Sequence, residues 1–309
     1  MTEPTTVHPD DGKGPATVDS LAADLRALGV EEGSLLLVHS SLKALGYVSG
    51  GAVAVLFALE KALGPEGTLV MPAFSSNLTD PSHWEKPPVP ESWWETIRAT
   101  MPAWDPGLTP PRKMGLVVET FLRREGTVRG DHPNASFAAR GPMARRILGE
   151  HPLGDELGER SPLGRLYAFD ARVLLLGVGH GNDTSLHLAE ARASFPGKRT
   201  ILQGAPIHRG GRREWVRYES LPYEGGDFEE IGAAFERETG AARVGPIGRG
   251  EARYFPQRSL VDFGVRWMEA ATSLAGRMRC ALSIATPDSL PISARTVRER
   301  ALSAREKRS

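Results

Sequence analysis

The sequence predicts an α/β fold, a layered sandwich in which helices cover both faces of a mixed, largely parallel central sheet. Two observations lead to this prediction. Short apolar runs at residues 35–38, 68–71 and 172–177 are typical of buried strands, and apolar residues at helical spacing separate the first two runs. Strands joined by helices favour parallel pairing, which places ligand sites beyond the carboxyl ends of the strands.

The elements expected in the first part of the chain end at turn residues, glycine above all. They are a helix at 18–28, a strand at 35–38, a helix at 52–63 and a strand at 68–71. The later part is expected to contain a helix at 115–124, strands at 172–177 and 215–218, a hairpin turn region at 204–213 and an amphipathic helix at 259–274.

The segment 73–113 has little regular periodicity, although it is far longer than an ordinary loop. Four tryptophans argue against disorder, namely Trp84, Trp93, Trp94 and Trp104. We therefore expect an ordered flap over a pocket. The remaining organisation is simple: residues 1–16 form a flexible arm, residues 17–283 form a single domain that includes the flap, and residues 284–309 form a mobile tail.

The composition excludes several classes of function. Basic and acidic residues both number 38, so the chain has no overall charge that would attract nucleic acid or an anionic membrane. No apolar stretch has the length of a membrane span. A single cysteine excludes an internal disulfide and a thiolate zinc cluster, which favours a cytoplasmic protein without a metal. A monomer or a homodimer is expected.

His187 and Glu190 are the residues most suited to catalysis. A buried run at 174–176 leads into glycines, Asp183 and its neighbours offer helix-capping oxygens, and His187 and Glu190 then lie three positions apart on the helix. Residues at this spacing share a helix face, so the carboxylate can orient the imidazole and raise its basicity. The alternative is an incidental histidine and glutamate on a capped helix.

Two other segments carry groups that bind acyl or phosphate oxygens. Ser40 and Ser41 follow a strand and offer hydroxyl and backbone N–H donors. The alternative for them is a simple strand-to-helix turn. The segment 131–137 is similarly open to interpretation as a turn that Pro133 fixes.

Taken together, these motifs resemble those of the aminoglycoside 3-N-acetyltransferase family. The resemblance covers about residues 18–272 and depends on the number and order of the motifs rather than on any one of them. The matching stretches are 37–42, 77–81, 90–94, 114–115, 119–121, 132–133, 136–141, 175–180, 184–190, 227–228, 245–248 and 260–263.

The resemblance implies a fold specific to this family, with acetyl-coenzyme A as cosubstrate and His187 and Glu190 as the catalytic pair. It also implies a pantetheine and phosphate channel lined by Ser40, Ser41, Leu42, His132, Ser136, Phe137 and Ala138. Where family members often have Asn-Thr before the helix, this chain has Asp183 and Thr184, which leaves the hydrogen bonds at that corner open.

The expected reaction is N-acetylation of the 3-amino group of an aminoglycoside, by direct transfer with His187 as general base. Cys280 has no features of an activated nucleophile, and a covalent route through Ser185 or Ser40 has less support. His39 is as well explained by catalysis or substrate contact as by a structural role. A polycationic substrate needs an acidic lining, for which the candidates are Asp80, Asp183, Glu224 and Asp227.

Two other functions stay open at this point. One is an acetyltransferase of the same fold that acts on a different amine, such as a biosynthetic intermediate. The other is a non-catalytic protein that binds an aminoglycoside or coenzyme A, which would show binding without release of the coenzyme A thiol.

Overall fold

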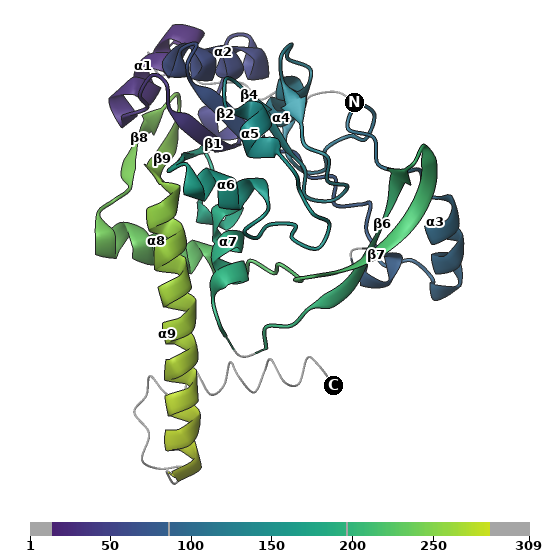
Figure 1. The fold of residues 1–309 in the computed structure, drawn as a ribbon. Coiled ribbons are helices and arrows are strands. Elements are labelled where there is room, and N and C mark those ends of the chain that lie inside the picture. The colour runs from purple at the N-terminus through teal and green to yellow at the C-terminus, as the bar shows by residue number, and fades with distance from the viewer. Residues whose placement is uncertain (1–13, 86, 196, 285–309) are drawn as a thin grey trace.

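A seven-stranded mixed sheet forms the centre of the protein within the part of the chain that the structure describes (Figure 1). The structure is a computed structural model that describes residues 14–85, 87–195 and 197–284. The strand order is β3 (Val128–Arg129), β4 (Phe137–Arg140), β2 (Thr68–Pro72), β1 (Leu35–Ser40), β5 (Arg172–Leu176), β9 (Gly250–Pro256) and β8 (Arg243–Ile247). The prediction of a mixed α/β fold is confirmed.

Parallel pairing is confined to the centre of the sheet. β1 pairs in parallel with β2 on one side and with β5 on the other. The outer pairs, β2 with β4, β4 with β3, β5 with β9 and β9 with β8, are all antiparallel. The sheet is therefore parallel where the predicted strands lie, and its antiparallel margins come from strands that the apolar pattern did not indicate.

Helices cover both faces of the sheet, as predicted. Alternate residues of β1 contribute to the cores on the two faces of the sheet. Leu36 and Val38 belong to one buried cluster, and Leu35 and Leu37 belong to the other. The first face packs against α1 (Val18–Leu28), α2 (Gly51–Leu63) and α4 (Leu116–Leu122). The second packs against α5 (Ala144–Leu148), α6 (Pro162–Ala168), α7 (Ser185–Arg192), α8 (Phe228–Thr239) and α9 (Gln257–Ile284).

The first helix illustrates how closely sequence signals fix an element. Thr17 and Ser20 form a reciprocal capping box at the N-terminus of α1. Gly29 follows its last residue with a φ of 103°, a left-handed conformation that favours glycine. Helix α1 therefore begins and ends where the sequence predicts.

A separate two-stranded hairpin of β6 (Ile201–Arg209) and β7 (Arg212–Ser220) extends to one side of the molecule (Figure 1). The predicted hairpin is confirmed, with its turn reduced to Gly210 and Gly211 because the strands are longer than expected. The described part of segment 73–113 packs along it and contains three short helices, η2 (Pro81–His83), η3 (Glu91–Trp93) and α3 (Trp94–Thr100).

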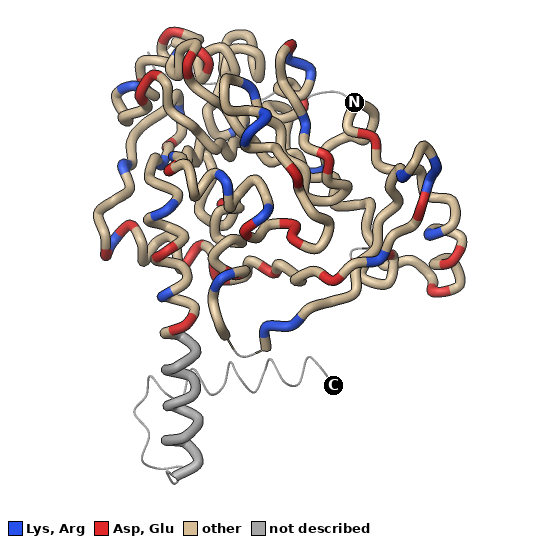
Figure 2. Tube along the Cα trace, viewed as in Figure 1, with Lys and Arg blue, Asp and Glu red and all other residues tan. Residues whose placement is uncertain are grey.

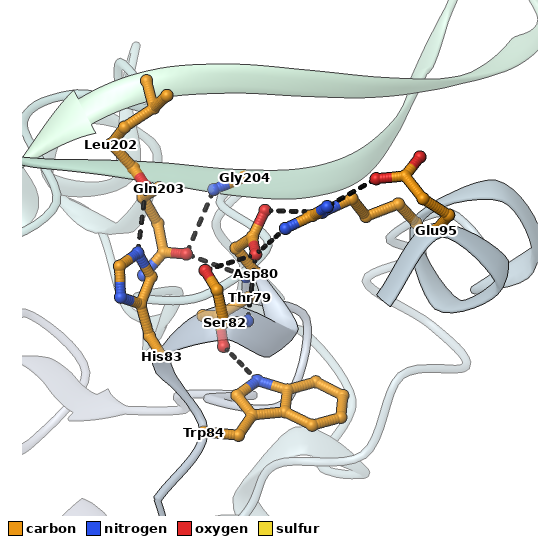
Figure 3. A network of polar contacts seen from close by, with 10 residues as sticks. Thr79, Asp80, Ser82, His83, Trp84, Glu95, Leu202, Gln203 and Gly204 are labelled. Atoms are coloured by element: carbon orange, nitrogen blue, oxygen red, sulfur yellow. Dashed lines mark hydrogen bonds and ion pairs between the residues drawn. The ribbon is translucent and has the colours of Figure 1, made fainter. Parts of the chain in front are cut away.

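Polar contacts join segment 73–113 to the hairpin (Figure 3). The Asp80 N–H donates to Gln203 Oε1 at 2.8 Å, and the Trp104 N–H donates to Pro206 O at 2.8 Å. The Arg213 guanidinium bonds the carbonyls of Met101 and Arg98. The segment is thus a regular part of the fold, and its expected role as a flap over a pocket stays a prediction.

The two ends of the chain fall largely outside the described residues. The predicted arm 1–16 lies there up to residue 13, whereas Ala16 is buried and forms a bridge with Val48. The predicted tail 284–309 lies outside from residue 285 onward, and α9 runs ten residues beyond the predicted helix end at 274.

No helix in the described part of the chain is both long and apolar enough to cross a bilayer. Basic and acidic residues are interspersed over the trace of the described chain (Figure 2), and the two are equal in number in the sequence. Any charge that selects a ligand is therefore local.

Candidate active site

His187 and Glu190 form a hydrogen-bonded pair on α7. Asp183 precedes this helix, and its Oδ1 accepts the N–H of Ser185, the first helical residue, at 2.9 Å. The His187 Nδ1–H donates to Glu190 Oε2 at 2.5 Å, and each side chain keeps 17% of its surface exposed. The predicted pair is therefore formed and partly open to solvent. Since the bond to the carboxylate places the proton on Nδ1, Nε2 is left as the proton acceptor.

The segment 221–227, which joins β7 to α8, completes the surroundings of this pair. The Gly225 N–H donates to Glu190 Oε1 at 3.2 Å, so both carboxylate oxygens accept a hydrogen bond. The His187 ring lies edge-to-face against Tyr223, at 5.3 Å between centroids, and against Phe228, at 4.7 Å. The sequence indicated Phe228 only as part of the matching stretch 227–228, and it did not indicate Tyr223 or Gly225. The only signal for those two was their place before a helix that carries acidic residues in its first turn.

His39 lies at the carboxyl end of β1, beside the start of α7. Its Nε2 is 3.3 Å from Thr184 Oγ1 and 3.8 Å from Asp183 Oδ1. Burial lowers the pKa of His39, the charge of Asp183 opposes this shift, and His187 adds to it. The structure thus brings His39, Asp183 and His187 into one electrostatic neighbourhood.

Asp183 and Ser185 have polar atoms without partners. Asp183 Oδ2 and Ser185 Oγ are buried and form no hydrogen bond within the described residues. Both residues have 0% exposure. A buried polar atom without a partner is costly, and native proteins retain such atoms mainly where a ligand, a water or catalysis uses them. The helix start next to His187 therefore offers unused acceptors and a hydroxyl donor.

The loop of Ser40, Ser41 and Leu42 lies at the same end of the sheet. The Ser41 N–H donates to Leu176 O at 2.9 Å, and a short helix, η1 (Leu42–Leu45), begins directly afterward. Gly177 packs against this loop with a φ of 70°, where an added Cβ would lie 2.7 Å from the Ala44 Cβ. All three residues of this loop, Ser40, Ser41 and Leu42, are partly exposed. Their role toward coenzyme A stays a prediction.

The predicted channel residues near β4 are buried side chains whose contacts run into the protein. His132 Nδ1 accepts the N–H groups of Asn134 and Ala135, and burial lowers the pKa of His132 to about 3. Ser136 Oγ–H donates to Ala73 O at 2.7 Å. Phe137 and Ala138 are fully buried in opposite cores. Their contact with coenzyme A stays a prediction.

The acidic candidates fall into two groups. Asp80 binds Arg98 through both oxygens, at 2.7 and 3.0 Å (Figure 3); burial raises its pKa, but Arg98 and Ser82 outweigh that and lower it to about 2. Glu224 and Asp227 are exposed and lie in the same segment as Gly225, whose N–H bonds Glu190. Glu224 and Asp227 are thus close in sequence to a residue that contacts the pair, whereas the charge of Asp80 is matched by Arg98.

No group of three or more metal-ligating side chains occurs among the residues that the structure describes. The remaining acidic candidate, Asp183, is fully buried and lies two residues before the start of α7. The candidate site therefore combines an oriented imidazole, buried polar atoms without partners at the start of α7, and exposed carboxylates in the segment before α8. Such a set of groups suits proton transfer from an amine.

Comparison with known proteins gives relatives over most of the chain. A family model described as aminoglycoside 3-N-acetyltransferase matches residues 37–269. The SPbeta prophage-derived aminoglycoside N(3')-acetyltransferase-like protein YokD of Bacillus subtilis is 46% identical over 254 residues, which are 82% of this chain and 92% of YokD. Aminoglycoside N(3)-acetyltransferase VII of Streptomyces paromomycinus is 39% identical, over 83% of this chain and 92% of the relative.

Solved structures agree with this fold. The crystal structure of YokD superposes with a TM-score of 0.80 and covers 82% of this chain and 94% of that one. AAC-IIIb in a binary complex with CoASH, 29% identical, has a TM-score of 0.75 and covers 84% and 98%. AAC-VIa bound to sisomicin, 30% identical, has a TM-score of 0.75 and covers 84% and 99%. The chain therefore belongs to the aminoglycoside 3-N-acetyltransferase family.

Proposed function

We propose that this protein transfers the acetyl group of acetyl-coenzyme A to the 3-amino group of an aminoglycoside, with His187 as general base. The observation that carries the proposal is the hydrogen bond of 2.5 Å between His187 Nδ1 and Glu190 Oε2, which fixes the imidazole with Nε2 as the acceptor. Family membership and relatives named for this reaction support it.

The chemistry follows from the fixed tautomer. When bound, acetyl-coenzyme A supplies the acetyl group as a thioester. Nε2 of His187 accepts one proton from the amine as the C–N bond forms, and returns that proton to the departing sulfur as the C–S bond breaks. Glu190 stabilises the imidazolium that exists between these two events. A positioned base of this kind contributes about 10²- to 10⁴-fold in rate.

The buried atoms at the start of α7 fit a cosubstrate whose carbonyl needs a donor. The unpartnered hydroxyl of Ser185 and the partly exposed loop of Ser40, Ser41 and Leu42 lie at the same end of the parallel strands. Ligands bind at this edge in α/β sheets. We assign the loop and the segment of His132, Ser136, Phe137 and Ala138 to the channel for coenzyme A. Substitution of Ser41 tests this assignment.

The exposed carboxylates suit a polycationic sugar. Glu224 and Asp227 flank Gly225, whose N–H bonds Glu190, so they extend the negative charge of the site outward. Asp183 adds a buried carboxylate near His39. Asp80 would act on a substrate only together with Arg98, because Arg98 binds both of its oxygens. A cytoplasmic site of action fits a chain with one cysteine.

Release of the coenzyme A thiol with a panel of aminoglycosides tests this function. The proposal expects thiol release with substrates that carry a free 3-amino group, and a product whose mass rises by one acetyl group at that nitrogen. A 3-N-blocked aminoglycoside serves as the matched control and should give no release. Turnover of a different amine in place of these drugs would indicate another acetyltransferase, and binding without thiol release would indicate a non-catalytic protein.

A further inference from the structure

The connection from β7 to α8 crosses directly beside the proposed base. Within it, Tyr223 places its ring edge-to-face against His187, at 5.3 Å between centroids and 76° between planes. Two residues later, the Gly225 N–H bonds Glu190 Oε1. One short segment thus contacts both members of the catalytic pair, and it comes from a part of the chain remote in sequence from α7.

The backbone of Tyr223 is held in an unfavourable conformation. Its φ of 42° lies in the left-handed region, which residues other than glycine and asparagine rarely adopt. Strain of this kind persists where the surroundings impose it, and it is found mostly at functional sites. The ring of Tyr223 is therefore held where it is by contacts that outweigh a local cost.

The hydroxyl of Tyr223 lies next to a buried polar cluster formed by Glu156, Asn134 and Tyr218. The Leu157 N–H donates to the Tyr223 hydroxyl oxygen at 3.3 Å. The neighbouring Glu156 is 4% exposed and accepts hydrogen bonds from Asn134 Nδ2 at 2.8 Å and from the Tyr218 hydroxyl at 3.2 Å. Because Tyr218 belongs to β7, the cluster fixes both the end of the hairpin and the ring of Tyr223.

The imidazole needs such a support because its bond to Glu190 fixes one atom only. The second torsion of a histidine side chain has a broad energy profile, so the ring can rock about the Nδ1–H bond and swing Nε2 sideways. The rings of Tyr223 and Phe228 both contact the imidazole and restrict that motion. The Phe228 plane is inclined to the imidazole by 62° and the Tyr223 plane by 76°.

We propose that Tyr223 is a positioning residue for the acetyl transfer: its ring, held by Leu157 and the Glu156 cluster, keeps the His187 imidazole in the orientation from which Nε2 accepts the amine proton. This inference rests on the proposed function. It goes beyond that function because it assigns the orientation of the base to the strained connection between the hairpin and α8, and not to Glu190 alone.

Three variants test the proposal by steady-state kinetics. Tyr223→Leu removes the ring and should lower kcat about 10- to 100-fold, with KM for the aminoglycoside nearly unchanged, because a misplaced base costs rate more than binding. Tyr223→Phe keeps the ring but loses the bond from the Leu157 N–H, so its loss in kcat should be smaller, about threefold. Tyr254→Leu is the matched control, since Tyr254 is a buried tyrosine of β9 in the opposite core.

Equal losses in Tyr223→Leu and Tyr254→Leu, or equal losses in Tyr223→Leu and Tyr223→Phe, would overturn the proposal, because general destabilisation or the hydroxyl would then explain the effect. A rise in KM with kcat retained would overturn it as well. If Tyr223→Leu does not fold, as judged by circular dichroism, Tyr223→Met replaces it with the same expected outcomes.

A spectroscopic measurement separates this inference from the proposed function. In unliganded wild-type protein, ¹⁵N-edited NMR of His187 should show one tautomer with the proton on Nδ1. Tyr223→Leu should show averaged ring nitrogen signals, and Tyr223→Phe should resemble wild type. Unchanged signals in Tyr223→Leu would contradict the positioning role even if the wild type proved inactive toward aminoglycosides, and inactivity with the expected signals would contradict only the proposed function.

Discussion

Replacement of Glu190 by Gln tests how much the carboxylate contributes to the base. Glu190 accepts two hydrogen bonds, from His187 Nδ1–H at 2.5 Å and from Gly225 N–H at 3.2 Å. Glutamine has a single carbonyl oxygen and an NH₂ group that can only donate, so one of the two donors loses its acceptor. The imidazolium formed during transfer also loses its counter-charge.

The size of the effect follows from the strength of the lost contact. A hydrogen bond to a charged group is worth about 1.5–3 kcal/mol, which corresponds to about 10- to 150-fold in kcat if it is lost mainly in the transition state. Thiol release at saturating aminoglycoside measures it. Glu159→Gln is the matched control, because Glu159 bonds Arg192 on the same helix but is 59% exposed at its side chain and remote from the pair's hydrogen bonds.

We expect Glu159→Gln to keep kcat within about twofold, as for most exposed ion pairs. Glu190→Gln with a kcat equal to that of Glu159→Gln would refute the reasoning that the carboxylate orients and charges the base. A loss seen only in KM would also refute it, since the carboxylate would then contribute to binding alone.

Three further predictions concern stability and substrate charge. Arg129 is half-buried and bonds the Ala73 carbonyl and the hydroxyls of two serines. Arg129→Met should therefore lower the free energy of unfolding by about 2–4 kcal/mol in urea titrations, and an unchanged midpoint would contradict this. Burial raises the pKa of Glu156 from 4.5 to about 7, so ionisation of this carboxyl should lower the free energy of unfolding as pH rises through that interval. The free energy of unfolding of Glu156→Gln should therefore rise by about 3 kcal/mol relative to that of wild type between pH 5 and pH 8. A difference that does not depend on pH would contradict this prediction. The double variant Glu224→Gln, Asp227→Asn should raise KM for an aminoglycoside about 3- to 10-fold at low salt and by less at about 0.5 M salt, with kcat retained. If the increase in KM were the same at both salt concentrations, the acidic lining would be contradicted.

The central elements of the fold were predictable because their signals are local. Helix α1 has its capping box at Thr17 and its glycine at position 29, and strands β1, β2 and β5 are continuous apolar runs. The antiparallel margins were not predictable in the same way. β3 has two residues, and β8 is largely exposed, so neither presents the apolar run that indicates a buried strand.

The residues of the site also differ in whether a local sequence signal predicts them. His187 and Glu190 are three positions apart on one helix, so their contact follows from helix geometry alone. Tyr223 and Gly225 reach the pair through the tertiary path of the chain from β7 to α8, and no local pattern encodes that path. The pairing of Asp80 with Arg98 is similar, because α3 lies in a tryptophan-rich segment without clear periodicity.

The activity of His187→Ala tests the central claim most directly, which is that an imidazole held by Glu190 removes the amine proton. His208→Ala is the control, because His208 is exposed on β6. Thiol release from acetyl-coenzyme A with a 3-amino aminoglycoside should fall about 10²- to 10⁴-fold in His187→Ala and stay near wild type in His208→Ala. Near wild-type turnover by a folded His187→Ala protein would contradict the account.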